Sequence, residues 1–522
     1  MTPSIIVSLF LTVVALSFFI WYGWLRHREV KTLTDFFLAP TPPTRMQLIS
    51  TLASTNTALA LTVFWFSFLG WQYGIGAAFW IFLYWLAGLE VWALFTRKLT
   101  DYPGQITEST RSEPHFQTLH EYISSRIPGD VTRRLLAVTS IMTFLLMVNV
   151  ELTRGTNVFH VLAPSQPVHL IELIALVLVL IAAIYAAVGG FRAVMRTDSF
   201  QWALSFVALL IALIFCLATL PLNWASLGPL WAISSEFSLL DLFLIPKGIF
   251  FILGSFFSWG FWFLVTMDMW QRGAAARNLN MIGRSSRKAL YPWFAFVTFT
   301  SVLIGLTVRT IDNYQFHPFP AVRFLDIAHQ VLGAIDIVGP LLFALLFLGF
   351  VSAMISTLDT YILVISHSVF RDLPSTSTRK LWVDQPLRRW MVAIATVGLA
   401  LAGYPLFLLL SHSNFDINAL LYIATSLPFV LLPSVILFKY KALQSSFSIS
   451  TGVVSGWLGT IAYVFWVLSA IHSSYGNQKA LTDWYNLMYI APLVASLSAL
   501  AGHVFGFFAG SLLTKPTKER VS

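Results

Sequence analysis

One stretch of this sequence, residues 352–360, places oxygen-bearing groups at helical spacing inside a long apolar run. On an α-helix the carbonyl of Ala353 lies one turn before the hydroxyls of Ser356 and Thr357, so three oxygens can reach one point. Oxygen ligands without a thiolate or an imidazole suit a hard cation rather than a transition metal. The spacing therefore predicts reversible binding of Na⁺. The alternative is that small residues only let two membrane helices pack closely, with the hydroxyls bonded back to their own helix.

An acidic residue, Asp359, lies on the same helical face as Ser352, Ser356 and Thr360. It precedes Arg371 by about 18 Å along a helix axis. An unpaired carboxylate at that depth in a membrane would cost at least about 2.5 kcal/mol. We therefore expect Asp359 to have a function, and its role stays open.

The composition places these residues in a membrane. Of 522 residues, 57% are hydrophobic and only 11% are charged, which is far from the range of soluble globular proteins. The chain lacks a GxxxxGK[ST] phosphate-binding loop, so any energy that it uses is expected to come from an ion gradient or from the solute itself rather than from ATP. Apolar segments long enough to span a bilayer cover 4–24, 46–70, 75–95, 136–161, 170–188, 199–220, 245–267, 290–308, 337–371, 387–410, 417–438, 451–471 and 485–512.

The positions of the basic residues predict the orientation. With the amino terminus outside and thirteen spans, nearly all of the 32 Lys and Arg residues fall on the cytoplasmic side. Only Lys247, Arg309, Arg323 and Lys479 fall outside, and Arg154 lies within a span. This distribution follows the positive-inside rule and predicts an integral protein of the plasma membrane, in a bacterium the inner membrane, with a cytoplasmic carboxyl terminus.

The segment 46–70 has two unlike halves. Residues 50–58 are small and polar, where lipid would demand apolar side chains. A helix interrupted there would expose carbonyl groups, which is tolerated only where they face a cavity or an ion. A helix interface made of small residues is the alternative. The second half, from 63 to 71, is aromatic and could line a solute pocket.

Two further segments carry charges. Glu151 and Arg154 lie well inside the segment 136–161, and either structural pairing or a solute-facing role explains them. Asp268 and Arg272, at the end of the segment 245–267, can pair at i,i+4, and a structural role is the better expectation.

Three motifs together resemble the signatures of the sodium/solute symporter family. Residues 189–201 are similar to the pattern GG-x-x-AV-x-x-TD-x-x-Q, residues 271–276 to Q-R-x-x-A-A, and residues 352–359 to S-A-x-x-S-T/S-x-D. They occur in the order of the family. The chain is therefore identified as a member, over nearly its whole length.

The resemblance implies an all-α polytopic fold of the LeuT type, with thirteen transmembrane helices in a single domain, 1–522. Two inverted five-helix repeats would cover 46–220 and 245–438, with an extra first span, two extra spans in 451–512 and a cytoplasmic tail, 513–522. Ion and solute would lie at the midplane, where the first helix of each repeat is broken. We expect those breaks near 53–57 and near 254–260.

The resemblance also implies the site. The sodium-site residues would supply three carbonyls and two hydroxyls, and they are Ala53, Asn56, Ala353, Ser356 and Thr357. Asp198 matches the family's acidic residue on the cytoplasmic side of that site, where it would serve a second ion or the release path. Capping of the following helix is the alternative for Asp198.

The resemblance to the family does not identify the solute. Thr55 stands where some amino-acid transporters carry an acidic residue, and the polar pattern of sugar transporters is absent. Aromatic rings would suit a cationic or apolar solute, whereas an arginine would suit a carboxylate, and both possibilities stay open. Six residues are expected to line the pocket: Thr57, Trp65, Glu151, Arg154, Trp259 and Trp262.

The expected function is Na⁺-coupled uptake of a small organic solute by alternating access. The alternative is a sensor that keeps the symporter scaffold and reports solute occupancy without accumulating the solute. The sequence holds no metal triad, nucleophile elbow or paired catalytic carboxylates, so we do not expect an enzyme. Na⁺ is the expected coupling ion, and the partners are the solute and the bilayer, without nucleic acid or an obligatory protein.

Overall fold

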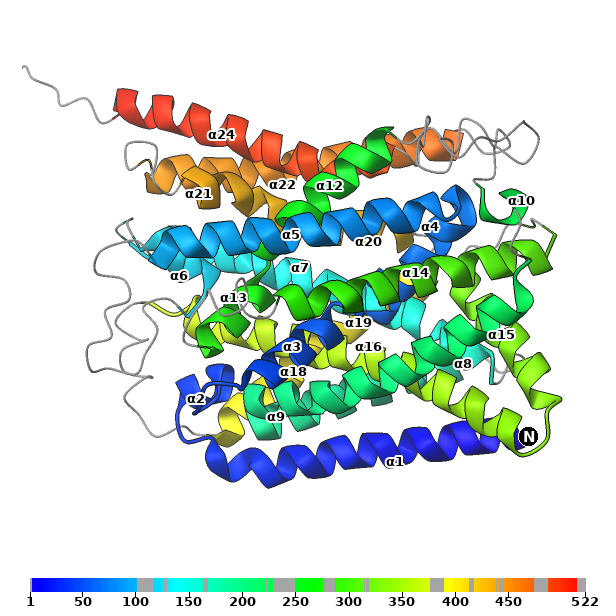
Figure 1. The fold of residues 1–522 in the computed structure, drawn as a ribbon. Helices are drawn as coiled ribbons and strands as arrows, with labels where there is room; N and C mark the ends of the chain where they lie inside the picture. Colours follow the sequence, from blue (N-terminus) through cyan, green and yellow to red (C-terminus); the bar gives the residue numbers. More distant parts are fainter. Residues whose placement is uncertain are drawn as a thin grey trace, which may run out of the picture.

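A computed structural model shows a bundle of long helices that run roughly side by side (Figure 1). The structure describes residues 2–100, 117–125, 127, 129–162, 168–221, 224–228, 249–276, 287–313, 315, 319–375, 389–412, 417–437, 440, 445–473 and 487–513. Within these ranges every regular element is helical. Lys247, Lys479 and nearly all of the expected tail lie outside the described residues.

The helices of the first half of the chain are α1 (Pro3–Arg26), η1 (His27–Glu29), α2 (Leu33–Leu38), α3 (Arg45–Thr55), η2 (Leu59–Phe64), α4 (Trp65–Tyr73), α5 (Gly76–Thr100), α6 (Leu119–Ser124), α7 (Val131–Gly155), α8 (Asn157–His160), α9 (Val168–Thr219) and α10 (Trp224–Leu227). Those of the second half are α12 (Ile249–Val265), α13 (Met267–Ala275), α14 (Arg287–Ile311), α15 (Pro320–Gly333), α16 (Val338–Arg371), α18 (Arg389–Ala402), α19 (Tyr404–His412), α20 (Ile417–Ser426), η5 (Leu427–Leu431), α21 (Leu432–Ile436), α22 (Ser446–Ser473) and α24 (Ala491–Leu513).

Nine helices among the described residues are long and apolar enough to cross a membrane, and two bent helix pairs raise the number to eleven. Helix α9 is 52 residues long, about 78 Å, which exceeds the thickness of one bilayer core. It is interrupted at Gly190, whose φ of 62° and ψ of −167° are not helical. A side chain there would meet the carbonyl oxygen of Phe36 at 2.7 Å, so only glycine fits this turn.

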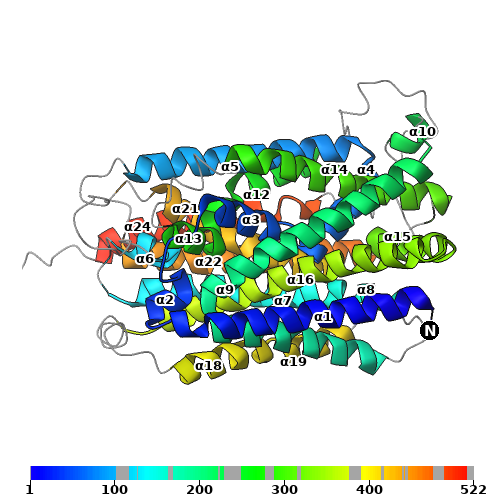
Figure 2. The ribbon, with the colours of Figure 1, turned by 60° about the horizontal axis from the view of Figure 1, so that its bottom comes forward.

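Helix α16 forms the centre of the bundle. It is continuous over 34 residues and packs against α9, α7 and α1. In Figure 1, α22 and α24 lie at one edge of the bundle and α1 lies at the other. Figure 2 shows α5 and α14 along a second edge, opposite α18 and α19. The stretch 352–360 therefore lies in the interior, where all nine residues are buried.

Both helix breaks predicted from the sequence exist, but the second lies elsewhere. The helix that begins at Arg45 is bent by 58° before it resumes at Leu59. The helices α12 and α13 meet at 42°, and the break is at Thr266 rather than near 254–260. Gly254 instead allows close packing, because a side chain there would lie 2.0 Å from the carbonyl oxygen of Tyr489. Since α13 continues to Ala275, this span is longer than predicted.

Two glycines allow α4 and α14 to touch backbone to backbone. A Cβ atom on Gly70 would lie 2.3 Å from the carbonyl oxygen of Val302, and one on Gly305 would lie 1.8 Å from that of Ser67. Small residues at such crossings are how membrane helices approach closely.

We therefore predict that Gly305→Ala destabilises the protein by about 1–3 kcal/mol, because the two backbones must move apart. Gly398→Ala is the matched control, since a Cβ atom there meets nothing within 4 Å. Thermal unfolding in detergent, followed by tryptophan fluorescence, measures both. Equal stability of the two variants would show that the α4–α14 contact is looser than described.

Candidate sodium and solute site

The site is built around the break between α3 and η2. Three residues, Asn56 to Ala58, separate the two helices, and Ala58 has an extended backbone with φ −52° and ψ 137°. The hydroxyl of Thr62 donates to the Asn56 carbonyl at 3.0 Å, and the hydroxyl of Thr57 donates to the Ala53 carbonyl at 2.6 Å. The two carbonyls at the predicted break are therefore bonded to side-chain hydroxyls, in a buried setting.

Helices α3 and α16 meet directly at the predicted sodium site. The hydroxyl oxygens of Ser54 and Ser356 lie 2.7 Å apart, which joins the residues before the break to the middle of α16. The Thr357 hydroxyl donates to the Ala353 carbonyl at 3.0 Å, one turn below it. The structure thus brings α3 and α16 together at Ser356, one of the residues predicted to bind sodium.

Asp198 is drawn into the same crossing from α9. Its carboxylate accepts a hydrogen bond from the Ser356 hydroxyl at 2.6 Å and another from the hydroxyl of Thr51. Asp198 is fully buried and lies inside a continuous stretch of α9, so it is not the cap of a helix. The neighbouring Thr197 hydroxyl bonds back to its own helix. The capping alternative for Asp198 is therefore wrong.

Arg272 completes a buried polar group that we call the Asp198 cluster, made of Thr51, Asp198, Arg272 and Ser356. The Arg272 Nη2 atom lies 3.9 Å from Asp198 Oδ2, and Nε donates to the Thr51 hydroxyl at 3.3 Å. Nη1 lies 3.7 Å from Asp268 Oδ2, so the predicted i,i+4 pair is present.

The cluster is larger than sequence reasoning suggested. Nη2 of Arg272 also donates to the hydroxyls of Thr55 and Thr360, so one guanidinium joins α13 to α3 and α16. The sequence placed Arg272 at the edge of a cytoplasmic loop, yet the residue is fully buried. The reason is that α13 continues past the break at Thr266. The motif of residues 271–276 was the available signal for its importance.

Glu151 lies on the other side of the break. Its carboxylate accepts hydrogen bonds from the amide of Leu59 at 2.8 Å and from the amide of Ala60 at 3.2 and 3.1 Å. The guanidinium of Arg154, one turn further along α7, lies 5.8 Å from the centre of the Trp65 ring. Both residues are buried with polar or aromatic partners, as expected for charges inside the membrane.

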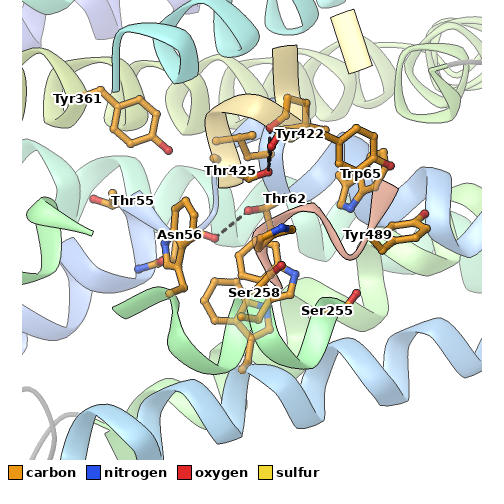
Figure 3. A pocket seen from close by; sticks show the side chains of 17 residues that line it. Thr55, Asn56, Thr62, Trp65, Ser255, Ser258, Tyr361, Tyr422, Thr425 and Tyr489 are labelled. Carbon is orange, nitrogen blue, oxygen red and sulfur yellow. Dashed lines mark hydrogen bonds between the residues drawn. The ribbon is translucent and has the colours of Figure 1, made fainter. Parts of the chain in front are cut away.

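A pocket lies against the break between α3 and η2. Figure 3 shows side chains from both sides of the helix break converging on this space. Its lining comprises Thr55, Asn56, Ala58, Leu61, Thr62, Trp65, Trp85, Ser255, Ser258, Trp259, Trp262, Tyr361, Leu421, Tyr422, Thr425, Tyr489 and Pro492.

Half of the predicted pocket residues line this space. Trp65, Trp259 and Trp262 do so. Thr57 does not, because its hydroxyl lies between the Ala53 carbonyl and the indole N–H of Trp293, which donates to it at 3.0 Å. Glu151 and Arg154 lie behind the lining, where they contact the helix amides and the Trp65 ring.

The pocket also includes residues that sequence reasoning missed. They come from spans without a charged residue, and they include Tyr422, Thr425 and Tyr489. The rings of Tyr422 and Tyr489 stand nearly perpendicular to each other, at 88° with centres 6.1 Å apart. Only the aromatic content of these spans could have indicated them.

Two groups of the stretch 352–360 remain outside these networks. Within the described part of the chain, neither carboxylate oxygen of Asp359 has a hydrogen-bond partner, and the same holds for the hydroxyl of Ser352. Both residues are buried. They share the helix of the sodium-site residues but not their partners.

The Asp198 cluster yields a stability prediction. Arg272→Met leaves two buried carboxylates, Asp198 and Asp268, without their cation, and removing one partner of a buried pair costs about 3–5 kcal/mol. Adding Asp198→Asn to this variant removes one of the two stranded charges, so we expect the double variant to be more stable than Arg272→Met alone. Thermal unfolding of the wild type, of the two single variants and of the double variant measures the interaction energy between the two side chains. Additive losses would mean that the two side chains do not interact.

Comparisons with known proteins agree with this geometry. The model of the sodium:solute symporter family matches residues 36–440. Sodium/proline symporters of Staphylococcus aureus and of its strain JH9 are 25% and 24% identical over 330 residues, 61% of this chain. That match spans only 61% and 60% of the length of these curated relatives.

A solved structure of a Na⁺-coupled sialic acid symporter, in a substrate-bound outward-open state, has a TM-score of 0.66 at 14% sequence identity and covers 99% of both chains. At this identity the likeness establishes the fold, which is of the LeuT type predicted from the sequence. The family model covers more than half of the chain. The protein therefore belongs to the sodium:solute symporter family, whose coupling ion is Na⁺.

Proposed function

We propose that the protein is a secondary active transporter that couples the inward movement of Na⁺ to the uptake of a small organic solute by alternating access. One observation carries this proposal: the break in the second span, to which we assign ligands of the ion, also borders the pocket. Asn56, whose carbonyl is one of the proposed ligands, lines the pocket. An ion and a solute that both bind next to the break at residues 56–58 can each stabilise the same backbone geometry. Binding of one then favours binding of the other, which is the physical basis of coupling.

The proposed Na⁺ ligands are the carbonyls of Ala53, Asn56 and Ala353 and the hydroxyls of Ser356 and Thr357. The contact of Ser54 with Ser356 supports this set, because it brings the two helices to hydrogen-bond distance. Asp198 lies next to the ligands through its bond with Ser356. We assign it to a second ion or to the path of ion release, since its carboxylate supplies negative charge without replacing a ligand.

We also propose the thirteen-span architecture with repeats at 46–220 and 245–438. The eleven spans described above become thirteen when α9 is divided at Gly190 and the apolar helix Leu420–Ile436 is added. This count supports the proposed number. The first residues of α1 and the last residues of α24 lie at opposite ends of the bundle in Figure 1, which fits termini on opposite sides of the membrane. The distribution of Lys and Arg supports the outside position for the amino terminus. Its bacterial relatives support a bacterial plasma membrane as its location.

Transport currents separate a symporter from a sensor. The protein is reconstituted into liposomes adsorbed on a solid-supported membrane, and uncharged and zwitterionic solutes are applied with and without Na⁺. A symporter gives a current that requires both the solute and Na⁺ and decays faster as the lipid-to-protein ratio is lowered. A brief transient whose decay does not depend on that ratio would favour the sensor.

The sodium site predicts a specific loss. Replacing Ser356 and Thr357 with alanine removes two oxygen ligands while helix propensity is kept. We expect the Na⁺ concentration for half-maximal stabilisation or uptake to rise at least about tenfold, which corresponds to about 1.4 kcal/mol of binding free energy. Thermal unfolding across a Na⁺ titration measures this without knowledge of the solute.

Ser366→Ala serves as the matched control for that titration. Ser366 lies on the same helix, but its hydroxyl donates to Thr396 at 3.1 Å rather than facing α3. Its Na⁺ dependence should equal that of the wild type. An unchanged Na⁺ dependence in the double variant would place the ion elsewhere.

A further inference from the structure

The amino-terminal end of the second half of the broken span is already occupied by a carboxylate of the protein. This half comprises η2 and α4, and it runs from Leu59 to Tyr73. Its first two amides, those of Leu59 and Ala60, both donate to Glu151 at 2.8–3.2 Å. Free amides at such a helix end, together with the helix dipole, are what attract an anionic group of a solute in transporters with broken helices.

Glu151 is held in this position from a separate helix. It lies on α7, more than 90 residues further along the chain than the amides that it binds, and its exposed fraction is 0%. Arg154, on the next turn of α7, is also buried and lies over the Trp65 ring, on the far side of the pocket wall. The positive helix end therefore already has a carboxylate partner inside the protein.

The pocket surface itself offers a different chemistry. Among its described lining residues none carries a charge. Indole and phenol rings provide flat apolar faces, and the hydroxyls of Ser255, Ser258, Thr62 and Thr425 provide hydrogen bonds. A charged group that enters this space would lose its hydration without meeting a counter-charge, which is costly in a low-dielectric environment.

We propose that the transported solute has no carboxylate group and is an uncharged molecule with a flat or apolar face and a few hydrogen-bonding groups. Glu151 occupies the position at which the carboxylate of an acidic solute would bind. This inference rests on the proposed function only in that the pocket is the solute site. It separates this protein from relatives whose named solutes, proline and sialic acid, carry a carboxylate.

Chemical rescue tests whether the helix end needs a carboxylate. Glu151→Ala frees the two amides and leaves room for a small acid. In Na⁺-free buffer, acetate as its N-methyl-D-glucamine salt should raise the apparent Tm of this variant by about 3 °C and leave the wild type within about 1 °C. Glu90→Ala is the control, because Glu90 binds the side chains of Arg287 and Tyr291 rather than helix amides. Acetate should not rescue it.

Equal shifts of the wild type and Glu151→Ala would overturn the proposal, because the helix end would then accept an acid with Glu151 in place. Absence of rescue would also overturn it, because the amides would then not select a carboxylate. This test reads only the folded protein without Na⁺, so its result is independent of whether transport occurs.

Matched solute pairs test the substrate class in the wild type with Na⁺ present. The pairs are galactose and galacturonate, uracil and orotate, and nicotinamide and nicotinate. Proline and sialic acid are tested as well, each without an uncharged partner. None of the acids should shift the apparent Tm. Stabilisation by an acid but not by its uncharged partner, or by proline or sialic acid, contradicts the proposal.

Discussion

The structure depends on satisfying the backbone groups that are released where the second span is broken. Inside a membrane no water is available for such groups, so each must find a partner within the protein. The carbonyl of Asn56 accepts from Thr62, and that of Ala53 accepts from Thr57 and from the Trp293 indole at 3.3 Å. The amides on the opposite side of the break are satisfied by Glu151 alone among the bonds described here. The break therefore separates a carbonyl-lined side from a carboxylate-capped side.

This division explains why the ion and the solute can have different chemistries at one place. Beside the carbonyl side, Ser54 of α3 contacts Ser356 of α16, whose hydroxyl adds a further oxygen for a hard cation. The other side faces an uncharged, ring-lined pocket. Below both, the Asp198 cluster ties the first half of the span to three other helices through one guanidinium. Any movement of α3 away from α16 must break these buried bonds together, which favours two discrete states over continuous motion.

The sequence revealed those parts of the site that consist of neighbouring residues. The small polar run at 50–58 predicted the first break, and the spacing of Ala353, Ser356 and Thr357 predicted one face of the ion site. The partners of Glu151 could not be predicted, because they are backbone amides of a distant segment that carry no side-chain signal. Thr57 was misplaced for a similar reason, since Trp293 on α14 holds its hydroxyl away from the pocket.

The second break shows the limit of reading glycines as helix breakers. Gly254 lies inside α12 because a neighbouring backbone approaches it, whereas Thr266 breaks the helix with an extended conformation of φ −98° and ψ 128°. Because the break lies at Thr266, the span continues as α13 to Ala275, and Arg272 on this helix is buried. The sequence prediction ended the span too early and therefore placed Arg272 next to a loop.

The central claim is that the carbonyls released by the break and the hydroxyls of α16 together bind Na⁺. A high-resolution cryo-EM structure determined with Na⁺ and again with N-methyl-D-glucamine tests it most directly. The claim predicts one additional density, present only with Na⁺, enclosed by the carbonyls of Ala53, Asn56 and Ala353 and the hydroxyls of Ser356 and Thr357. A sodium-dependent density elsewhere, with these five oxygens unchanged in their hydrogen bonds between the two structures, would contradict it.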